Sequence, residues 1–267
     1  MRGILLSIKG EQLKELKLPE VFSTEYRPDV IQRVIVGIQK NRRQPYGADR
    51  MAGKRTSAHY HGRRHDRWTM MNREMARLPR LHGKIGYLAY RARFAPQTVK
   101  GRVAHPPKVE KVWAEKINKK EWLKALYSAV SSTINKHLIF SRGHIIDESK
   151  KLPLVLDDSF EKLKKTKDVL KVLYTIGLEK ELERVKNGKK ERAGKGSMRG
   201  RRYKKVKGPL IIIGKDGNVS VSAKNIEGVD ISPVDKLTVE HFAPGTHPGR
   251  LCIWTKSALL KLDSMAG

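Results

Sequence analysis

The sequence of 267 residues contains only one cysteine, Cys252. A single thiol cannot form an intrachain disulfide or supply a thiolate cluster for zinc, and it implies no oxidising compartment. Long apolar runs are also missing, since none approaches the roughly 18 residues of a membrane-spanning helix. The apolar part of MRGILLSIKG is too short for a signal sequence, and no small-residue cleavage site follows it. We therefore expect a soluble, intracellular protein without contact with a membrane.

Acidic residues are scarce, with 27 Asp and Glu against 57 Lys and Arg, and the net charge is +30. Residues 40–105 hold 17 basic and three acidic side chains, and residues 184–208 hold 12 basic ones and only Glu191. These two segments carry 25 of the 30 net charges. Clustered cations predict a polyanionic partner, because each neutralised phosphate releases counterions. A membrane surface is disfavoured because neither segment has an apolar helical face.

Outside the two basic segments, apolar residues recur with the periods of strands and helices. Buried strands are expected at residues 152–156 and 209–213, and shorter or weaker ones at 250–254 and 229–231. Residues 4–8 are expected to form a strand that is followed by a turn and a short return segment through Leu13, Leu16 and Leu18. Helical spacing marks residues 28–41, 122–134, 170–176 and 255–265, and a further helical turn is expected at 182–185 after a stop at Gly177. The alternation predicts an α/β fold: a three-layer α/β/α domain with a mainly parallel sheet of about four strands. We expect residues 1–39 and 106–267 to form this domain. Residues 40–105 are expected to be a long extended basic loop inserted after the first helix.

Polar residues at the ends of these elements read as caps. Asn118 and Glu121 have the spacing of a capping box, and Thr255 is a natural N-cap for the terminal helix. Asp157 and Asp158 follow a predicted strand and could in principle form a carboxylate pair for acid or metal chemistry. Because no third ligand or base converges on them, we interpret them as a helix N-terminal cap.

No motif for nucleotide binding or catalysis is complete. Between Gly188 and Gly194 lie five residues where a Walker loop has four, and Gly196 stands where that loop needs Ser or Thr. No Ser/His/Asp or Cys/His set can be assembled from spacing, so we expect neither an enzyme nor a cofactor. An RNA-processing or RNA-modifying enzyme remains one alternative, and it would need a convergent cluster of titratable residues. A DNA-compacting basic protein is the other, and it would bind duplex DNA equally well.

Histidines and aromatic residues are interleaved with the cations of residues 40–105. His59, His61 and His65 could be read as metal ligands, but the neighbouring Arg63 and Arg64 oppose a bound dication. We interpret these histidines as groups that stack on bases or contact phosphates. The segment has too little apolar area to offset its ordering cost of about 1 to 2 kcal/mol per residue. It is therefore expected to be mobile until it binds RNA.

Six strings in this sequence resemble one known family. They are LPEVFSTEYRPDVI at 18–31, GADRMAGKRTSA at 47–58, MARLPR at 75–80, FAPQTVKGRVAHPPKVEK at 94–111, AGKGSMRGRRYKKVKGPLIII at 193–213 and APGTHPGRLCIWT at 243–255. Together and in this order, they are similar to the archaeal and eukaryotic branch of the ribosomal protein L-four family. The matches extend over nearly the whole chain.

The resemblance implies an α/β domain on the outside of the large ribosomal subunit, in the cytoplasm, that contributes to subunit assembly. It further implies that the loop threads into large-subunit rRNA. There, with the hairpin of the L-twenty-two protein, the loop would narrow the exit tunnel of the nascent peptide. The tip of the loop maps to ten residues: Arg77, Leu78, Pro79, Arg80, Leu81, His82, Gly83, Lys84, Ile85 and Gly86. The string LHGKIGYLAY is bulkier and more apolar here than the glycine-rich tips of many relatives.

Given this resemblance, we predict that exposed cations of the two basic segments hold the rRNA, mainly through its phosphates and shape. The predicted contacts in the loop are Arg42, Arg43, Lys54, Arg55, Arg63, Arg64, Arg77, Arg80, Arg102 and Lys108. Those in the second segment are Lys195, Arg199, Arg201, Arg202, Lys204 and Lys205.

Overall fold

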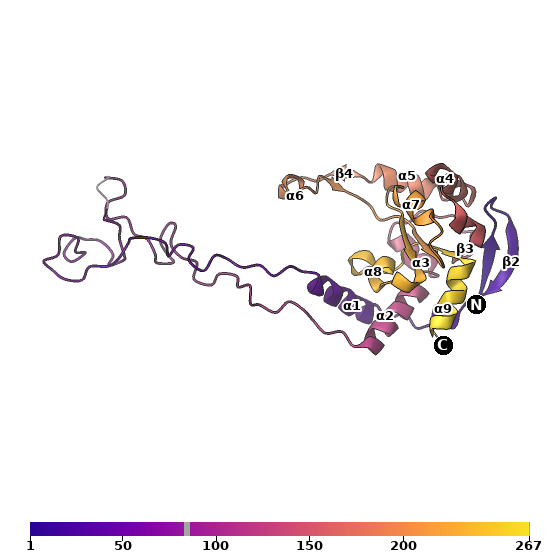
Figure 1. Cartoon of the computed structure of the whole chain (residues 1–267), viewed down its shortest axis with the longest axis horizontal. Helices are drawn as coiled ribbons and strands as arrows, with labels where there is room; N and C mark the ends of the chain where they lie inside the picture. The colour runs from indigo at the N-terminus through magenta and orange to yellow at the C-terminus, as the bar shows by residue number, and fades with distance from the viewer. Residues whose placement is uncertain (83–85, 267) are drawn as a thin grey trace. The chain divides into compact units, whose positions relative to one another are not determined.

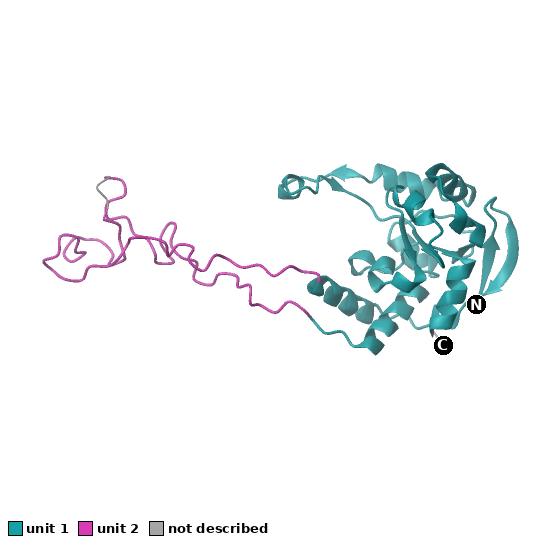
Figure 2. Ribbon diagram, in the orientation of Figure 1, with its two compact units in different colours: residues 1–41, 115–267 teal, residues 42–114 magenta. Residues whose placement is uncertain are grey.

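Two units make up the chain in the computed structural model, which describes residues 1–82 and 86–266. Unit 1 consists of Met1–Asn41 and Glu115–Gly267, and unit 2 is Arg42–Ala114 (Figure 2). The expected division at residues 40 and 105 stays a prediction. Unit 1 contains a central sheet and the helices that cover it (Figure 1).

The sheet of unit 1 has six strands in the order β2-β1-β3-β8-β6-β7. Only the β1–β2 pairing is antiparallel, and β1, β3, β8, β6 and β7 are parallel to one another. All side chains of β3, β6 and β8 are buried, which explains their unbroken apolar runs. The bounds are β1 Arg2–Leu6, β2 Gln12–Lys17, β3 Leu154–Leu156, β6 Leu210–Ile213, β7 Asp230–Pro233 and β8 Cys252–Thr255.

Two hydrophobic cores lie on opposite faces of this sheet. Alternate residues of β6 separate between them: Leu210 and Ile212 belong to one core, Ile211 and Ile213 to the other. Helices α1 (Pro28–Asn41), α2 (Lys119–Ser131), α8 (Val239–Phe242) and α9 (Lys256–Ala266) contribute to the first core. Helices α3 (Lys136–Ser141), α4 (Thr166–Thr175), α5 (Glu179–Asn187) and α7 (Val219–Lys224) contribute to the second. This confirms the expected three-layer α/β class.

The sheet is larger than the expected four strands because its edge strands have weak sequence patterns. In β2, only Leu16 is partly buried, and the rest of the strand is exposed. In β7, only Ser232 is fully buried. An edge strand packs fewer of its side chains, so its sequence carries less of the apolar signal.

Most of the predicted caps are present. The Thr255 hydroxyl oxygen accepts from the backbone N–H of Ala258 at 3.3 Å, which confirms its role as the N-cap of α9. Asp157 caps the short 3₁₀ helix Asp158–Lys162, and Asp158 accepts from the backbone N–H of Ser257 at 2.7 Å. Both carboxylates therefore have the capping role predicted for them.

The capping box at the start of α2 was a wrong prediction. Asn118 does occupy the N-cap position, but its side chain makes no capping hydrogen bond. The carboxylate of Glu121 instead pairs with the Arg33 guanidinium of α1 at 3.0 Å. Because α1 packs against α2, the Glu121 side chain pairs with a residue of the other helix and does not cap its own.

No helix in residues 1–82 and 86–266 is long and apolar enough to cross a membrane.

Candidate nucleic-acid interface

Unit 2 has almost no apolar interior. Met70 is the only buried hydrophobic side chain among its described residues, and these residues form no helix or strand longer than an isolated bridge. Backbone hydrogen bonds still join distant parts of the segment. The N–H of Arg80 donates to the His59 carbonyl at 3.1 Å, and that of Leu81 donates to the Arg91 carbonyl at 3.0 Å. Such a segment presents most of its polar and charged groups outward.

Aromatic and cationic side chains meet where the first and last parts of unit 2 come together. The Trp113 indole stacks near Tyr46 with ring centroids 6.0 Å apart. The Arg43 guanidinium lies 3.7 Å from the Trp113 ring centroid, and the Lys111 ammonium lies 4.3 Å from it. Cations over an indole face are attracted by its quadrupole. Trp113 was not among the residues predicted from the sequence to contact RNA. The only signal in the sequence that could have identified it is the presence of cationic residues nearby.

Two glycines allow the backbones within unit 2 to touch. Gly53 has a φ of +72°, and a Cβ added there would lie 2.3 Å from the Gly101 carbonyl oxygen. A Cβ on Gly101 would lie 1.9 Å from the Ala95 carbonyl oxygen. Neither position accepts a side chain without a shift of backbone, so the two glycines fix this close approach.

Three imidazoles converge in the middle of unit 2. The ring centroids of His59, His61 and His82 are 4.2 to 4.6 Å apart, and the Trp68 indole stacks on His82 at 4.8 Å. Burial, followed by the neighbouring His59 and His61, lowers the pKa of His82. His65, the third member of the sequence cluster, is exposed and lies outside this group.

The predicted rRNA contacts of the loop fall into two groups. Eight of them are exposed: Arg42, Arg43, Lys54, Arg55, Arg63, Arg64, Arg77 and Lys108. Arg80 and Arg102 are partly buried. The Arg80 guanidinium donates to the carbonyls of Tyr90 and Ala76, both at 2.8 Å, so it supports the fold of the loop. Its predicted contact with rRNA, like the others, stays a prediction.

The predicted tip is only partly within the described residues. Gly83, Lys84 and Ile85 lie outside them. Arg77 and Gly86 are exposed, whereas Leu78, Pro79, Leu81 and His82 are partly buried. This tip is more apolar than the glycine-rich tips of many relatives, and the partly buried Leu81 is one of the side chains that make it so.

The second basic segment forms a hairpin within unit 1. Strands β4 (Lys190–Glu191) and β5 (Tyr203–Lys204) pair antiparallel, and the short helix α6 (Lys195–Met198) lies between them. Glu191 pairs with Arg202 at 2.6 Å, and the Lys189 ammonium lies 5.0 Å from the Tyr203 ring centroid. All six predicted contacts are exposed: Lys195, Arg199, Arg201, Arg202, Lys204 and Lys205.

A cationic pocket of about 490 Å³ lies at the base of this hairpin. Its lining includes Arg142, Arg184, Lys207 and His247. Burial, then the nearby Arg250, lowers the pKa of Arg142 to about 10, and its guanidinium donates to the Pro244 carbonyl at 2.9 Å. Sequence reasoning missed Arg142 because it belongs to neither basic segment, and only the fold brings it to the hairpin.

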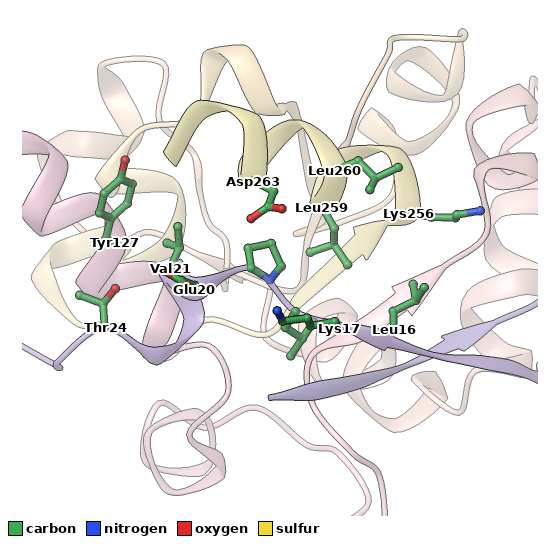
Figure 3. Close-up of a pocket in the computed structure, with 12 residues that line it drawn as sticks. Leu16, Lys17, Glu20, Val21, Thr24, Tyr127, Lys256, Leu259, Leu260 and Asp263 are labelled. Carbon is green, nitrogen blue, oxygen red and sulfur yellow. The ribbon is translucent and has the colours of Figure 1, made fainter. Parts of the chain in front are cut away.

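A larger pocket of about 720 Å³ lies between the N-terminal strands and α9 (Figure 3). Leu259, Leu260 and Asp263 of α9 line it together with Lys17 and Glu20. Its described lining contains no histidine or cysteine.

Comparisons with known proteins agree on one family. The model of the "Ribosomal protein L4/L1 family" matches residues 16–265. The "Large ribosomal subunit protein uL4" of Archaeoglobus fulgidus is 47% identical over 259 residues, or 97% of this chain and 97% of the relative. The protein of that name from Methanocaldococcus jannaschii is 44% identical over 262 residues, or 98% of each. That from Methanosphaera stadtmanae is 44% identical over 259 residues, or 97% of this chain and 95% of the relative. On a match of this extent and identity, the chain belongs to the ribosomal protein L4/L1 family.

Proposed function

We propose that the chain is a structural constituent of the large ribosomal subunit in the cytoplasm, and not an enzyme. Family membership supports this role, since the curated relatives bear the name of a large-subunit protein. The partners that follow are large-subunit rRNA and neighbouring ribosomal proteins.

The observation that best supports rRNA binding is that the clustered basic residues lie away from the apolar core. Fourteen of the sixteen predicted contacts are exposed, and they lie on unit 2 and on the β4–β5 hairpin. Unit 2 buries a single hydrophobic side chain among its described residues, so a stable fold there needs an external partner. Phosphates supply that partner through charge-assisted contacts, while the sheet of unit 1 holds the hairpin in place.

At the finer level, we propose that unit 2 helps to form the constriction of the nascent-peptide exit tunnel. Its partners there would be the L-twenty-two protein and the nascent peptide. The partly buried Leu78, Pro79 and Leu81 give the tip a supported shape, and exposed Arg77 presents a cation beside them. Contribution to subunit assembly follows from the same contacts, because an arm that orders on RNA also orders the RNA around it.

Co-sedimentation of the full chain with large subunits tests the structural role. We expect stoichiometric recovery in the large-subunit peak after a high-salt wash. Equal affinity for duplex DNA and absence from that peak would favour the DNA-compacting alternative. Turnover of an RNA substrate by the purified chain would favour an RNA-processing or RNA-modifying enzyme.

A stalled nascent chain carrying a photoreactive group tests the tunnel position. Crosslinks are expected at residues 77–82 and 86, where the tip is described. Crosslinks confined to residues 47–57 would place the tip elsewhere in unit 2. Absence of crosslinks to any part of unit 2 would remove the tunnel proposal while leaving rRNA binding intact.

A further inference from the structure

The three converging imidazoles of unit 2 have the donor set of a metal site. His59, His61 and His82 each offer one ring nitrogen, and these three atoms all lie within 4.8 Å of one another. A point within about 2.8 Å of all three nitrogens therefore exists, and each nitrogen needs to move by only about 0.7 Å to reach a zinc–nitrogen distance of about 2.1 Å. Side-chain rotation supplies such a shift.

The hydrogen bond of His59 leaves its other ring nitrogen free to bind a ligand. The Nδ1 atom of His59 lies 3.0 Å from the Ser57 carbonyl oxygen. A carbonyl only accepts, so the proton of His59 is on Nδ1 and the lone pair is on Nε2. A backbone carbonyl on the outer nitrogen is the usual partner of a metal-bound histidine, since it fixes both tautomer and ring orientation.

The other two rings each have a nitrogen without a hydrogen-bond partner. The Nε2 atoms of His61 and His82 are both buried and have no hydrogen-bond partner. The Nδ1 atom of His61 lies 3.7 Å from the Asp66 carboxylate, which is too far for a hydrogen bond but places a negative charge beside that ring. A buried ring nitrogen without a partner is unfavourable, because it has lost its contact with water, and two of them in one cluster favour the binding of a ligand.

The cations nearby do not occupy the cluster. The Arg80 guanidinium is directed to the carbonyls of Tyr90 and Ala76. Arg63 and Arg64 are exposed, where solvent and salt screen their charge. Asp66 adds one negative charge beside His61. The electrostatic objection raised by the sequence HYHGRRH therefore weakens once the side chains are placed.

We propose that His59, His61 and His82 bind a divalent transition-metal ion, with zinc as the first choice. Imidazole nitrogens favour zinc over the hard cations magnesium and calcium, which take oxygen ligands. Three protein ligands leave a fourth position for water.

Such an ion would act as a clip within unit 2. It joins His59 to His82 across an intervening stretch of the chain, and it holds the Trp68 ring that stacks on His82. Closing a loop of this kind lowers the entropy of the unfolded segment and so stabilises the folded one. Unit 2 gains little stability from apolar burial, and the ion would supply stability by this other route.

Zinc titration of the purified, chelator-treated full chain tests the proposal by calorimetry. We expect one tight site per chain. His82→Gln should weaken that site by at least about 10-fold, because even a lost outer partner of a ligand costs about 10- to 100-fold. His59→Gln should do the same. The matched control is His65→Gln, which removes an exposed histidine from the same segment and should leave the affinity unchanged.

Two further measurements separate a built site from general binding to histidines. Cobalt in place of zinc should give the visible absorption of a four-coordinate ion in the wild-type chain and lose it in His82→Gln. Zinc should also slow amide exchange near Met70 in the wild-type chain and not in His82→Gln. Equal loss of affinity in His65→Gln and His82→Gln, or no stoichiometric site, would overturn the proposal and leave the three rings as simple packing.

Discussion

The carboxylate of Glu161 accepts a hydrogen bond from the hydroxyl of Thr255 at 2.6 Å, and both side chains are buried. The same carboxylate accepts from the backbone N–H of Gly214 at 2.8 Å and from the Ser257 hydroxyl at 2.6 Å. These partners lie at the carboxyl ends of β6 and β8, where open α/β sheets commonly bind ligands. Here a closed network of the chain's own groups fills part of that position.

Replacing this carboxylate should destabilise unit 1. Glu161→Ala removes the shortest acceptor of the Gly214 N–H and of the Thr255 hydroxyl, and leaves them the longer contacts of 3.3 Å to the Thr255 oxygen and 3.4 Å to the Ile212 carbonyl. Poorly paired buried donors are unfavourable, so we expect a loss of about 1 to 3 kcal/mol in the free energy of unfolding. Urea denaturation followed by circular dichroism measures it. The exposed control Glu11→Ala should stay within about 0.5 kcal/mol of the wild type, and an equal effect of both changes would contradict the network.

Stability should fall in acid partly through Asp230. Burial opposes ionisation of this carboxyl, but the Arg250 guanidinium at 2.6 Å and the Lys207 ammonium at 2.8 Å outweigh it and lower its pKa. A lowered folded-state pKa gives stabilisation that is complete above the unfolded pKa of about 3.9 and is lost as pH falls through the folded value.

Asp230→Asn should therefore flatten the dependence of stability on pH below about pH 4, by at most about 1.4 kcal/mol per pH unit. Denaturant midpoints collected across that range measure the slope. The exposed change Asn225→Ala removes no ionisable group and serves as the control. If the stability of Asp230→Asn depended on pH as steeply as that of the control, Arg250 and Lys207 would not be what keeps this carboxyl ionised.

The β4–β5 hairpin should contribute to the salt dependence of rRNA binding. Arg199, Arg201 and Arg202 are exposed, and reversing all three to Glu removes up to three phosphate contacts. We expect weaker binding and a salt slope lower by up to about 2 to 3, at about 0.7 to 0.9 per contact. Filter binding to large-subunit rRNA at several salt concentrations gives the slope.

A charge-matched control distinguishes contact from net charge. Lys164, Lys165 and Lys167 are exposed at the start of α4, outside both basic segments. Reversing these three to Glu changes the net charge by the same amount. If both triple variants lowered the slope equally, general attraction and not the hairpin would explain the binding.

Unit 2 should be mobile in the free protein in the absence of metal and RNA. Met70 is its only buried hydrophobic side chain among the described residues, so local opening should cost little free energy. Amide exchange of the full chain should be fast across residues 51–100 and slow in β3, β6 and β8. Adding rRNA should bring protection to residues 51–100. Strong protection there in the free, metal-free chain would contradict this expectation.

The strongest strand signals were those of the sheet's centre. Ile211 and Ile213 face one core and Leu210 and Ile212 the other, so β6 had to be apolar throughout and was readable from its composition. β2 could not be counted in this way because its side chains are largely exposed. Glu121 shows the other limit: its spacing fitted a cap, but Arg33 of a different helix took its carboxylate.

The sequence by itself determined the α/β class, the family and the two basic segments, because apolar period, long matching strings and clustered charge are properties of neighbours along the chain. Only the tertiary structure decided which distant groups meet. It joined His82 to His59 and His61 and left out His65, which the sequence places closer to them. It also brought Arg142 to the hairpin. Such long-range contacts depend on how the chain folds back on itself, and the spacing of residues along the sequence does not determine them.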